Sequence, residues 1–125
     1  MTDKKIILIE DDHNIIEMYK IRLEGAGFKL SIASDGESGL DLAKSQPADL
    51  ILLDVMMPKM DGFAVLSRLK QDDKTKNIPV LLLTNLGQKA DMEKGKAMGA
   101  NDYIVKSSLT PSQVLEKINL HLKNK

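Results

Sequence analysis

The segment LILLDVMMPKMDG, residues 50–62, indicates the fold more strongly than any other part of the sequence. Four apolar residues, Leu50 to Leu53, run directly into an acidic one, Asp54, and a proline and an Asp-Gly pair follow. A strand that is apolar at every position is covered on both faces, as strands of parallel sheets are. Asp61 can then cap a following helix. The segment therefore predicts a buried strand that delivers a carboxylate at its carboxyl end.

Similar apolar runs recur at residues 6–9 and 80–83, and weaker strand candidates are residues 29–33 and 102–105. The segments between them carry apolar residues at helical spacing. Strands and helices that alternate in this way predict a parallel sheet with helices on both faces, a three-layer α/β sandwich. We expect one domain over residues 1–125, because no linker, repeat or low-complexity tract interrupts the pattern.

Capping patterns predict where two of the helices begin. Ser34 and Glu37 have the spacing of a capping box, in which each side chain bonds the other residue's backbone. Thr110 and Gln113 have the same spacing, with Pro111 at the first helical position. We expect helices to start at both places.

The composition excludes several classes of protein. The 18 basic and 18 acidic residues give a net charge of zero, so nothing favours direct binding to nucleic acid or to a membrane surface. Cysteine is absent, which excludes disulfides, thiol catalysis and thiolate zinc sites. No apolar run approaches the roughly 20 residues that span a bilayer, and the first residues lack the pattern of a signal peptide. We expect a cytoplasmic protein.

Polar side chains follow the strands at the point where each one ends. Residues 10–12 (EDD) follow the first run, Asp54 the third strand, Thr84 the fourth and Lys106 the fifth. In an open α/β sheet, ligands bind beyond the carboxyl ends of the strands, so these groups should lie close together. Clustered carboxylates raise one another's pKa unless a cation intervenes, and Mg²⁺ suits carboxylates, a carbonyl and water. An ionised Asp54 could then act as a nucleophile toward a phosphoryl group.

These positions resemble a known family. Residues 10–12, the segment DVMMPKMDG at 54–62, Thr84 and the segment YIVK at 103–106 are similar to the motifs of response-regulator receiver domains, the phosphoacceptors of two-component signalling. The resemblance extends over essentially the whole chain. It implies a flavodoxin-like fold whose five parallel strands have the order 2-1-3-4-5. It also implies that the protein is a signalling module rather than an enzyme. Such a module assists its own phosphorylation and its own slow dephosphorylation.

The resemblance assigns roles at the acidic end of the sheet. Asp54 matches the aspartate that takes a phosphoryl group from a phosphohistidine. Asp11 and Asp12 match the pair that binds Mg²⁺, and Met56 matches the residue whose backbone carbonyl also binds it. The cofactor implied is Mg²⁺.

The resemblance also assigns a switch. Thr84 and Lys106 match the hydroxyl and the ammonium that contact the phosphoryl group, and Tyr103 matches the aromatic residue that changes rotamer with the hydroxyl. Two positions depart from the family pattern. Asn85 stands where a smaller residue is usual, and Ser107 stands where proline is usual, so we expect an altered phosphorylation rate and a locally altered loop.

The first helix carries a second stripe beside its expected core residues. Its core face is predicted to consist of Ile16, Tyr19 and Leu23. Ile15, Met18 and Arg22 form the additional stripe, and extra apolar surface at helical spacing suggests a partner. In the family, a sensor histidine kinase or a histidine phosphotransfer domain docks on this helix. The output would go to a downstream protein partner or to an output domain outside the chain. This partner would respond to a change in the face formed by residues 87–123.

Other functions stay open at this point. The same fold could be a pseudo-receiver, a constitutive interaction module that is not phosphorylated, and Asn85 and Ser107 are compatible with that. A flavodoxin-type flavin carrier is disfavoured, because the acidic loop at residues 10–12 would repel the flavin phosphate. A metal-dependent phosphatase with an aspartyl nucleophile would need a second acid where Met56 stands.

Overall fold

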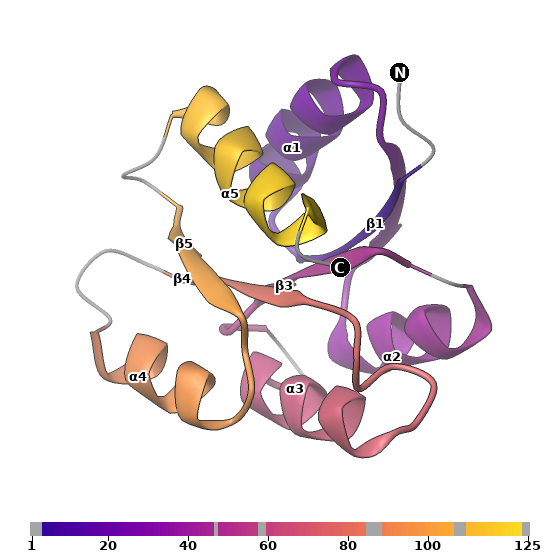
Figure 1. Ribbon diagram of the computed structural model, residues 1–125, viewed down its shortest axis with the longest axis vertical. Helices are drawn as coiled ribbons and strands as arrows, with labels where there is room; N and C mark the ends of the chain where they lie inside the picture. Colours follow the sequence, from indigo (N-terminus) through magenta and orange to yellow (C-terminus); the bar gives the residue numbers. More distant parts are fainter. Residues whose placement is uncertain (1–3, 47, 58–59, 85–88, 107–109, 124–125) are drawn as a thin grey trace.

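Strands and helices alternate along the chain (Figure 1). The structure, a computed structural model, describes residues 4–46, 48–57, 60–84, 89–106 and 110–123. The strands are β1 (Lys5–Ile9), β2 (Lys29–Ala33), β3 (Leu50–Asp54), β4 (Val80–Thr84) and β5 (Asp102–Val105). The helices are α1 (His13–Gly25), α2 (Gly36–Ser45), α3 (Gly62–Gln71), α4 (Lys89–Ala97) and α5 (Pro111–Lys123).

The strands form one parallel sheet in the order β2-β1-β3-β4-β5, so the predicted fold is confirmed. Strand β3 lies at the centre, where Ile51 pairs with Ile7 of β1 and with Val80 of β4. Every residue of β3, including Asp54, is buried. The uninterrupted apolar run thus marks the strand that has neighbours on both sides and helices on both faces.

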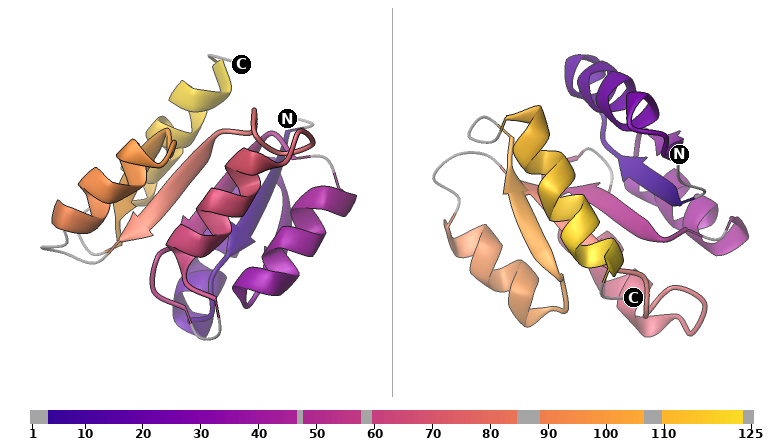
Figure 2. Two further views of the ribbon diagram at one scale, coloured as in Figure 1. Left: turned by 90° about the horizontal axis from the view of Figure 1, so that it is seen from below. Right: turned by 45° about the horizontal axis from the view of Figure 1, so that its top comes forward.

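The helices cover the two faces of the sheet unequally (Figures 1 and 2). Helices α1 and α5 lie on one face, and α2, α3 and α4 on the other. Alternate residues of β1 serve the two cores: Ile6 and Leu8 pack with α1 and α5, whereas Ile7 and Ile9 pack with α2 and α3. The sheet therefore forms the middle layer of the predicted three-layer sandwich.

The predicted start of α5 is confirmed, and that of α2 is wrong. The Gln113 side chain accepts a hydrogen bond from the Thr110 N–H at 2.8 Å, and the Thr110 hydroxyl accepts one from the Gln113 N–H at 3.2 Å. At α2 the cap is Asp35, not Ser34, and its carboxylate accepts from the Ser38 N–H at 2.8 Å. Ser34 and Asp35 are both good N-cap residues, and the Asp35 carboxylate is the one that caps α2.

Two glycines permit close contacts between helices and the sheet. A Cβ atom on Gly62 would collide with the backbone of Asp54, so α3 can begin directly against the end of β3. A Cβ on Gly95 would collide with the Leu82 side chain. Gly95 therefore lets α4 approach β4 closely, although a glycine inside a helix weakens the helix itself.

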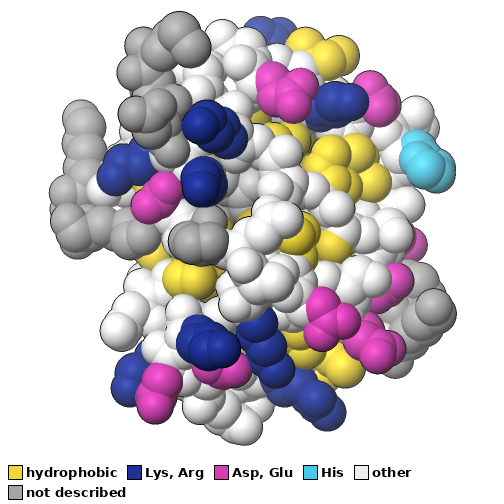
Figure 3. All heavy atoms as spheres, turned by 90° about the vertical axis from the view of Figure 1, so that its right-hand side faces the viewer, with side chains coloured by type: hydrophobic (Ala, Val, Ile, Leu, Met, Phe, Trp, Pro, Cys, Tyr) yellow, Lys and Arg dark blue, Asp and Glu magenta, His cyan; other side chains and the backbone are white. Residues whose placement is uncertain are grey.

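The surface carries both signs of charge. Figure 3 shows the side of the molecule where acidic and basic side chains are interspersed and apolar side chains reach the surface in small patches. This mixture agrees with the net charge of zero. Within the described residues, no helix combines the length and the apolar composition needed to cross a membrane.

Candidate functional site

The carboxyl ends of β1, β3 and β5 bring three charged side chains together. Lys106 Nζ lies 2.9 Å from Glu10 Oε1 and 3.1 Å from Asp54 Oδ2. Glu10 and Asp54 are 0% and 2% exposed, and the Lys106 side chain is 15% exposed. The Lys106 N–H also donates to the Thr84 carbonyl at 2.8 Å, which holds the end of β5 against β4. The predicted convergence of strand-end side chains is thus present for these residues.

Three carboxylates of the described residues form a group that could hold a cation. One oxygen from each of Glu10, Asp11 and Asp54 lies within 4.8 Å of the others. Glu10 Oε2 accepts hydrogen bonds from the N–H groups of Asp11 and Asp12, at 3.0 and 3.1 Å. Glu10 Oε1 is buried and pairs with the Lys106 ammonium at 2.9 Å. Three grouped carboxylates with a single ammonium between them fit a hard divalent cation.

This grouping differs from the one predicted, which paired Asp11 with Asp12. Asp12 is the N-cap of α1, and its Oδ1 accepts from the N–H groups of Asn14 and Ile15 at 2.9 and 3.3 Å. The helix begins at His13, so the carboxylate before it is used for capping. Glu10, which the prediction did not name as a metal ligand, is the acid that groups with Asp11 and Asp54 in the structure.

The electrostatics of this group show an excess of negative charge. Burial, together with the Asp54 carboxylate, raises the pKa of Glu10 above its ordinary value, and the Lys106 ammonium only partly opposes this. Burial alone would lower the pKa of Lys106, but Glu10 and Asp54 outweigh it and the pKa is raised. One ammonium thus neutralises two buried carboxylates incompletely, and a cation would complete the balance.

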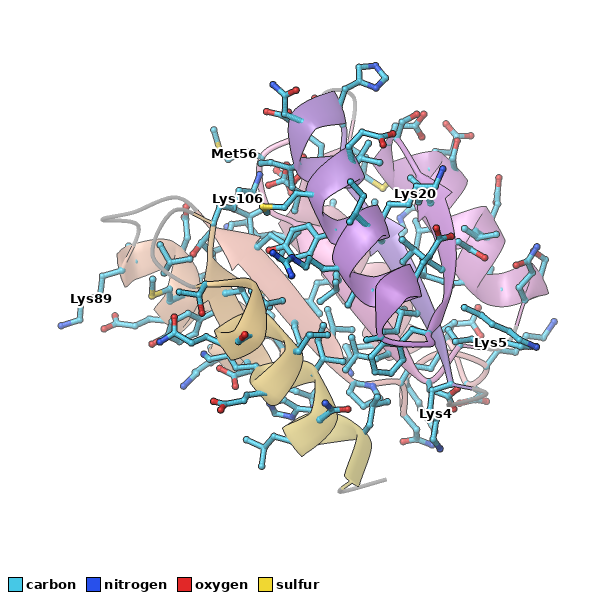
Figure 4. All side chains as sticks on the ribbon, turned by 90° about the horizontal axis from the view of Figure 1, so that it is seen from above. Lys4, Lys5, Lys20, Met56, Lys89 and Lys106 are labelled. Atoms are coloured by element: carbon cyan, nitrogen blue, oxygen red, sulfur yellow. The ribbon has the colours of Figure 1, made fainter. Side chains whose placement is uncertain are left out.

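The backbone after β3 holds Asp54 in place. The Met56 N–H donates to Asp54 Oδ1 at 3.0 Å, and the Gly62 N–H donates to the Val55 carbonyl at 3.1 Å. Figure 4 shows Met56 and Lys106 at the same end of the sheet, opposite the end where Lys5 begins β1. Met56 is 63% exposed, and its contact with Asp54 is made by its backbone N–H rather than by its side chain.

The two predicted switch residues lie on adjacent strands. Thr84 is buried at the end of β4, and its hydroxyl is 3.5 Å from the Ile104 carbonyl, which it can reach as a weak donor. Tyr103 is half-buried on β5, the edge strand. The structure therefore places Thr84 at the acidic end of the sheet and Tyr103 two residues before the end of β5.

One charged cluster near Tyr103 was not predicted from the sequence. Asp102 Oδ1 accepts from Lys117 Nζ at 3.2 Å, and Asp102 Oδ2 lies 2.9 Å from His121 Nε2. Lys117 also donates to the Tyr103 carbonyl at 2.7 Å. Burial alone would raise the pKa of Asp102, but His121, the Tyr103 N–H and Lys117 outweigh it and hold the pKa below its ordinary value.

Comparisons with known proteins decide the family. A model of the response regulator receiver domain matches residues 6–119. The chain belongs to this family. Receiver domains are signalling phosphoacceptors that bind Mg²⁺ at an acidic site and interact with histidine kinases. The acidic group at the carboxyl edge of the sheet lies where such a site is expected.

Curated relatives of this receiver domain include longer transcriptional regulators. RpaA of Synechocystis, a DNA-binding dual master transcriptional regulator, is 47% identical over 102 residues, which is 82% of this chain and 42% of RpaA. PhoP of Bacillus subtilis, which regulates alkaline phosphatase synthesis, is 36% identical over 97% of this chain and 49% of PhoP. The chain thus spans less than half of the length of these relatives.

Solved structures of receiver domains have the same fold. The chemotaxis protein CheY4 of Vibrio cholerae is 28% identical, with a TM-score of 0.88 over 95% of this chain and 98% of CheY4. The receiver domain of the sensor histidine kinase PA1611 of Pseudomonas aeruginosa has a TM-score of 0.89 over 98% of this chain and 99% of that one, at 21% identity. That structure holds a magnesium ion in its active-site cleft.

The first helix of this receiver domain has the predicted core face. Ile16, Tyr19 and Leu23 are buried. Of the second stripe, Ile15 is partly buried against the core, whereas Met18 is 41% exposed and Arg22 is exposed. Met18 and Arg22 also line a pocket between α1 and α5 that reaches Lys106.

Several receiver-domain positions lie outside the described residues. They are Pro58, Asn85 and Ser107, together with the residues 87–88 and 107–109 of the predicted output face. The expectations for an altered phosphorylation rate at Asn85 and an altered loop at Ser107 therefore stay predictions.

Proposed function

We propose that this receiver domain takes a phosphoryl group on Asp54 from the phosphohistidine of a sensor histidine kinase or of a histidine phosphotransfer domain. The observation that supports this most is the position of Asp54. It is a buried carboxylate at the end of the central strand, 3.1 Å from the Lys106 ammonium and grouped with Glu10 and Asp11. A structural aspartate would not need two further acids beside it.

Each group has a chemical role in the transfer. A bond forms between an Asp54 carboxylate oxygen and phosphorus as the phosphorus–nitrogen bond breaks, and the histidine nitrogen keeps the electron pair and takes a proton from solvent. The Lys106 ammonium and the Thr84 hydroxyl would each bind an oxygen of the transferred group. Phosphoryl transfer depends mainly on positioning and on neutralising negative charge, which these side chains supply.

The magnesium ion would be held by the carboxylates of Glu10, Asp11 and Asp54 and by the Met56 backbone carbonyl. When bound, it would neutralise charge on the carboxylates and on the phosphoryl oxygens. Asp12 would act on α1 as a helix cap rather than as a ligand, because its Oδ1 already accepts two backbone hydrogen bonds. The oxygens of Glu10, Asp11 and Asp54, which lie within 4.8 Å of one another, support this choice of ligands.

The phosphorylated state would be read out through β4 and β5. Thr84 would move toward the phosphoryl group, and Tyr103 would change rotamer, so the surface formed by α4, β5 and α5 would change its affinity for a partner. The longer relatives are named as transcriptional regulators, which supports an output domain or a separate downstream protein as the receiver of this signal.

The kinase or phosphotransfer domain would dock on α1 through Ile15, Met18 and Arg22. The exposed Met18 and Arg22 border the pocket that leads to Lys106, and so a partner there would lie close to Asp54. Met18→Asp should slow transfer from a partner protein without changing phosphorylation by acetyl phosphate. Equal slowing in both assays would contradict docking at this position.

The test of the phosphoacceptor is intact-protein mass after incubation with acetyl phosphate, with Mg²⁺ or with EDTA. The wild type should gain one phosphoryl group only with Mg²⁺, and Asp54→Asn should gain none. Asp61→Asn is the matched control, because Asp61 caps α3 and asparagine caps equally well. A folded wild type that gains nothing would refute the proposal and favour the pseudo-receiver, the alternative interaction module.

A further inference from the structure

The ring of Tyr103 is contacted by two ammonium groups that come from opposite faces of the sheet. Lys96 Nζ of α4 lies 5.2 Å from the ring centroid, and Lys117 Nζ of α5 lies 4.7 Å from it. Both distances are within the range of a cation–π interaction. Because β5 is the edge strand, a side chain on it can reach helices of both outer layers. Tyr103 therefore links α4 to α5.

Lys117 is the more strongly fixed of the two lysines. Its ammonium donates to the Tyr103 carbonyl at 2.7 Å and to Asp102 Oδ1 at 3.2 Å. Asp102 is in turn held by His121, at 2.9 Å. The Lys117 side chain is 30% exposed, so these contacts are partly shielded from solvent. Lys96 is exposed and makes a looser contact with the same ring.

We propose that Lys96 and Lys117 are positioning residues that hold the Tyr103 ring at the sheet edge and thereby set how readily the domain switches. This inference rests on the proposed switch role of Tyr103. A ring that leaves the edge loses both cationic contacts, so each lysine favours the state in which the ring stays. A partly exposed cation–π contact corresponds to a change of about two- to fivefold in the ratio of the two ring positions.

Lys94 provides a matched control on the same helix. Its Nζ lies 4.4 Å from the centroid of Phe63, a ring on α3. Lys94→Met removes one cation–π contact and one positive charge from α4, as Lys96→Met does, but it leaves the ring of Tyr103 untouched. Any effect shared by the two variants would come from the charge of α4 rather than from Tyr103.

The ring can be observed directly, because the chain contains only two tyrosines, Tyr19 and Tyr103. Protein labelled with 3-fluorotyrosine should give two fluorine resonances, and Tyr19→Phe assigns the one from Tyr103. Lys96→Met and Lys117→Met should each move this resonance toward its position in the wild type with Mg²⁺ and acetyl phosphate. Lys94→Met should leave it in place, and Lys117→Arg, which keeps a cation over the ring, should restore it.

Two results would overturn the proposal. One is a Tyr103 resonance that moves no more in Lys96→Met and Lys117→Met than in Lys94→Met. The other is an equal movement in Lys117→Arg and Lys117→Met. If Lys117→Met fails to fold, the exposed Lys96 still decides the question. The intact mass of the wild type with Mg²⁺ and acetyl phosphate separates the two proposals. A wild type that gains no phosphoryl group would refute only the proposed function, and a larger movement in Lys96→Met and Lys117→Met than in Lys94→Met would still support the positioning role.

Discussion

Two charged clusters meet at β5, and they differ in how their charges balance. The acceptor cluster joins residues from three strand ends: Glu10, Asp54 and Lys106. The edge cluster joins β5 to α5: Asp102, Lys117 and His121. The acceptor cluster has two carboxylates for one ammonium, and Asp11 adds a third carboxylate nearby. The edge cluster has one carboxylate for two basic groups.

The pKa of the central acid moves in opposite directions in the two clusters. The pKa of Glu10 is raised by burial and by Asp54, whereas the partners of Asp102 lower its pKa despite burial. The charge of the Asp102 carboxylate in the edge cluster is therefore balanced within the protein, and these contacts stabilise the attachment of α5 to β5. The acceptor cluster is incomplete, and the missing positive charge is what an external cation would supply.

The largest expected effect comes from removing the ammonium of the acceptor cluster. Lys106→Met leaves the carboxylates of Glu10 and Asp54 buried without a counter-charge, so the free energy of unfolding in EDTA should fall by about 3–5 kcal/mol. Saturating Mg²⁺ should recover most of this loss. Urea unfolding with and without Mg²⁺ measures both quantities.

Lys117→Met is the matching change in the edge cluster. It should lower the free energy of unfolding by about 1 kcal/mol or less, and by the same amount with and without Mg²⁺, because Asp102 keeps His121. An equal response of both variants to Mg²⁺ would show that the acceptor cluster depends on a cation no more than the edge cluster does.

An intermediate effect should separate the acids that follow β1. Asp11→Asn should weaken Mg²⁺ binding by about tenfold or more, whereas Asp12→Asn should change it less than about twofold, because asparagine also caps a helix. Stabilisation of the fold by increasing Mg²⁺ gives the affinities. If Asp12→Asn weakened Mg²⁺ binding more than Asp11→Asn, Asp12 would be a ligand in addition to its role as a helix cap.

A further small effect concerns the pH dependence of the edge cluster. The pKa of Asp102 is lowered from its ordinary value of 3.8, so its partners stabilise the fold above that pH and cease to do so as the pH falls through the lowered value. Asp102→Asn should remove about 1 kcal/mol at neutral pH and should lose less stability than the wild type on acidification. Urea unfolding between about pH 5 and pH 2 tests this, and parallel curves for the two proteins would contradict it.

The sequence predicted the sheet well because the central strands carry an unambiguous signal. A run such as residues 50–53 is apolar at every position, and only a strand covered on both sides needs that. The acceptor cluster followed from the same reasoning, since the carboxyl ends of parallel strands lie at one edge. Which of the adjacent acids faces Asp54 could not be predicted, because it depends on where α1 begins and on Asp12 being used as its cap.

The edge cluster gave no comparable signal. Asp102 is 15 residues from Lys117 and 19 residues from His121, and the charges of α5 read as an ordinary solvated helix face. Only the packing of α5 against β5 brings them together. The contact of Tyr103 with Lys96 and Lys117 has the same origin, because it depends on β5 lying at the edge of the sheet.

The ion pairs of Lys106 also constrain the order in which the chain can complete its fold during synthesis. Glu10 and Asp54 leave the ribosome long before Lys106, which pairs with both but follows the last strand. A nascent chain that has formed β1 and β3 therefore carries two uncompensated carboxylates until β5 emerges. Lys106 follows the last strand, so the ion pairs of these buried acids can form only when nearly all of the domain has been translated.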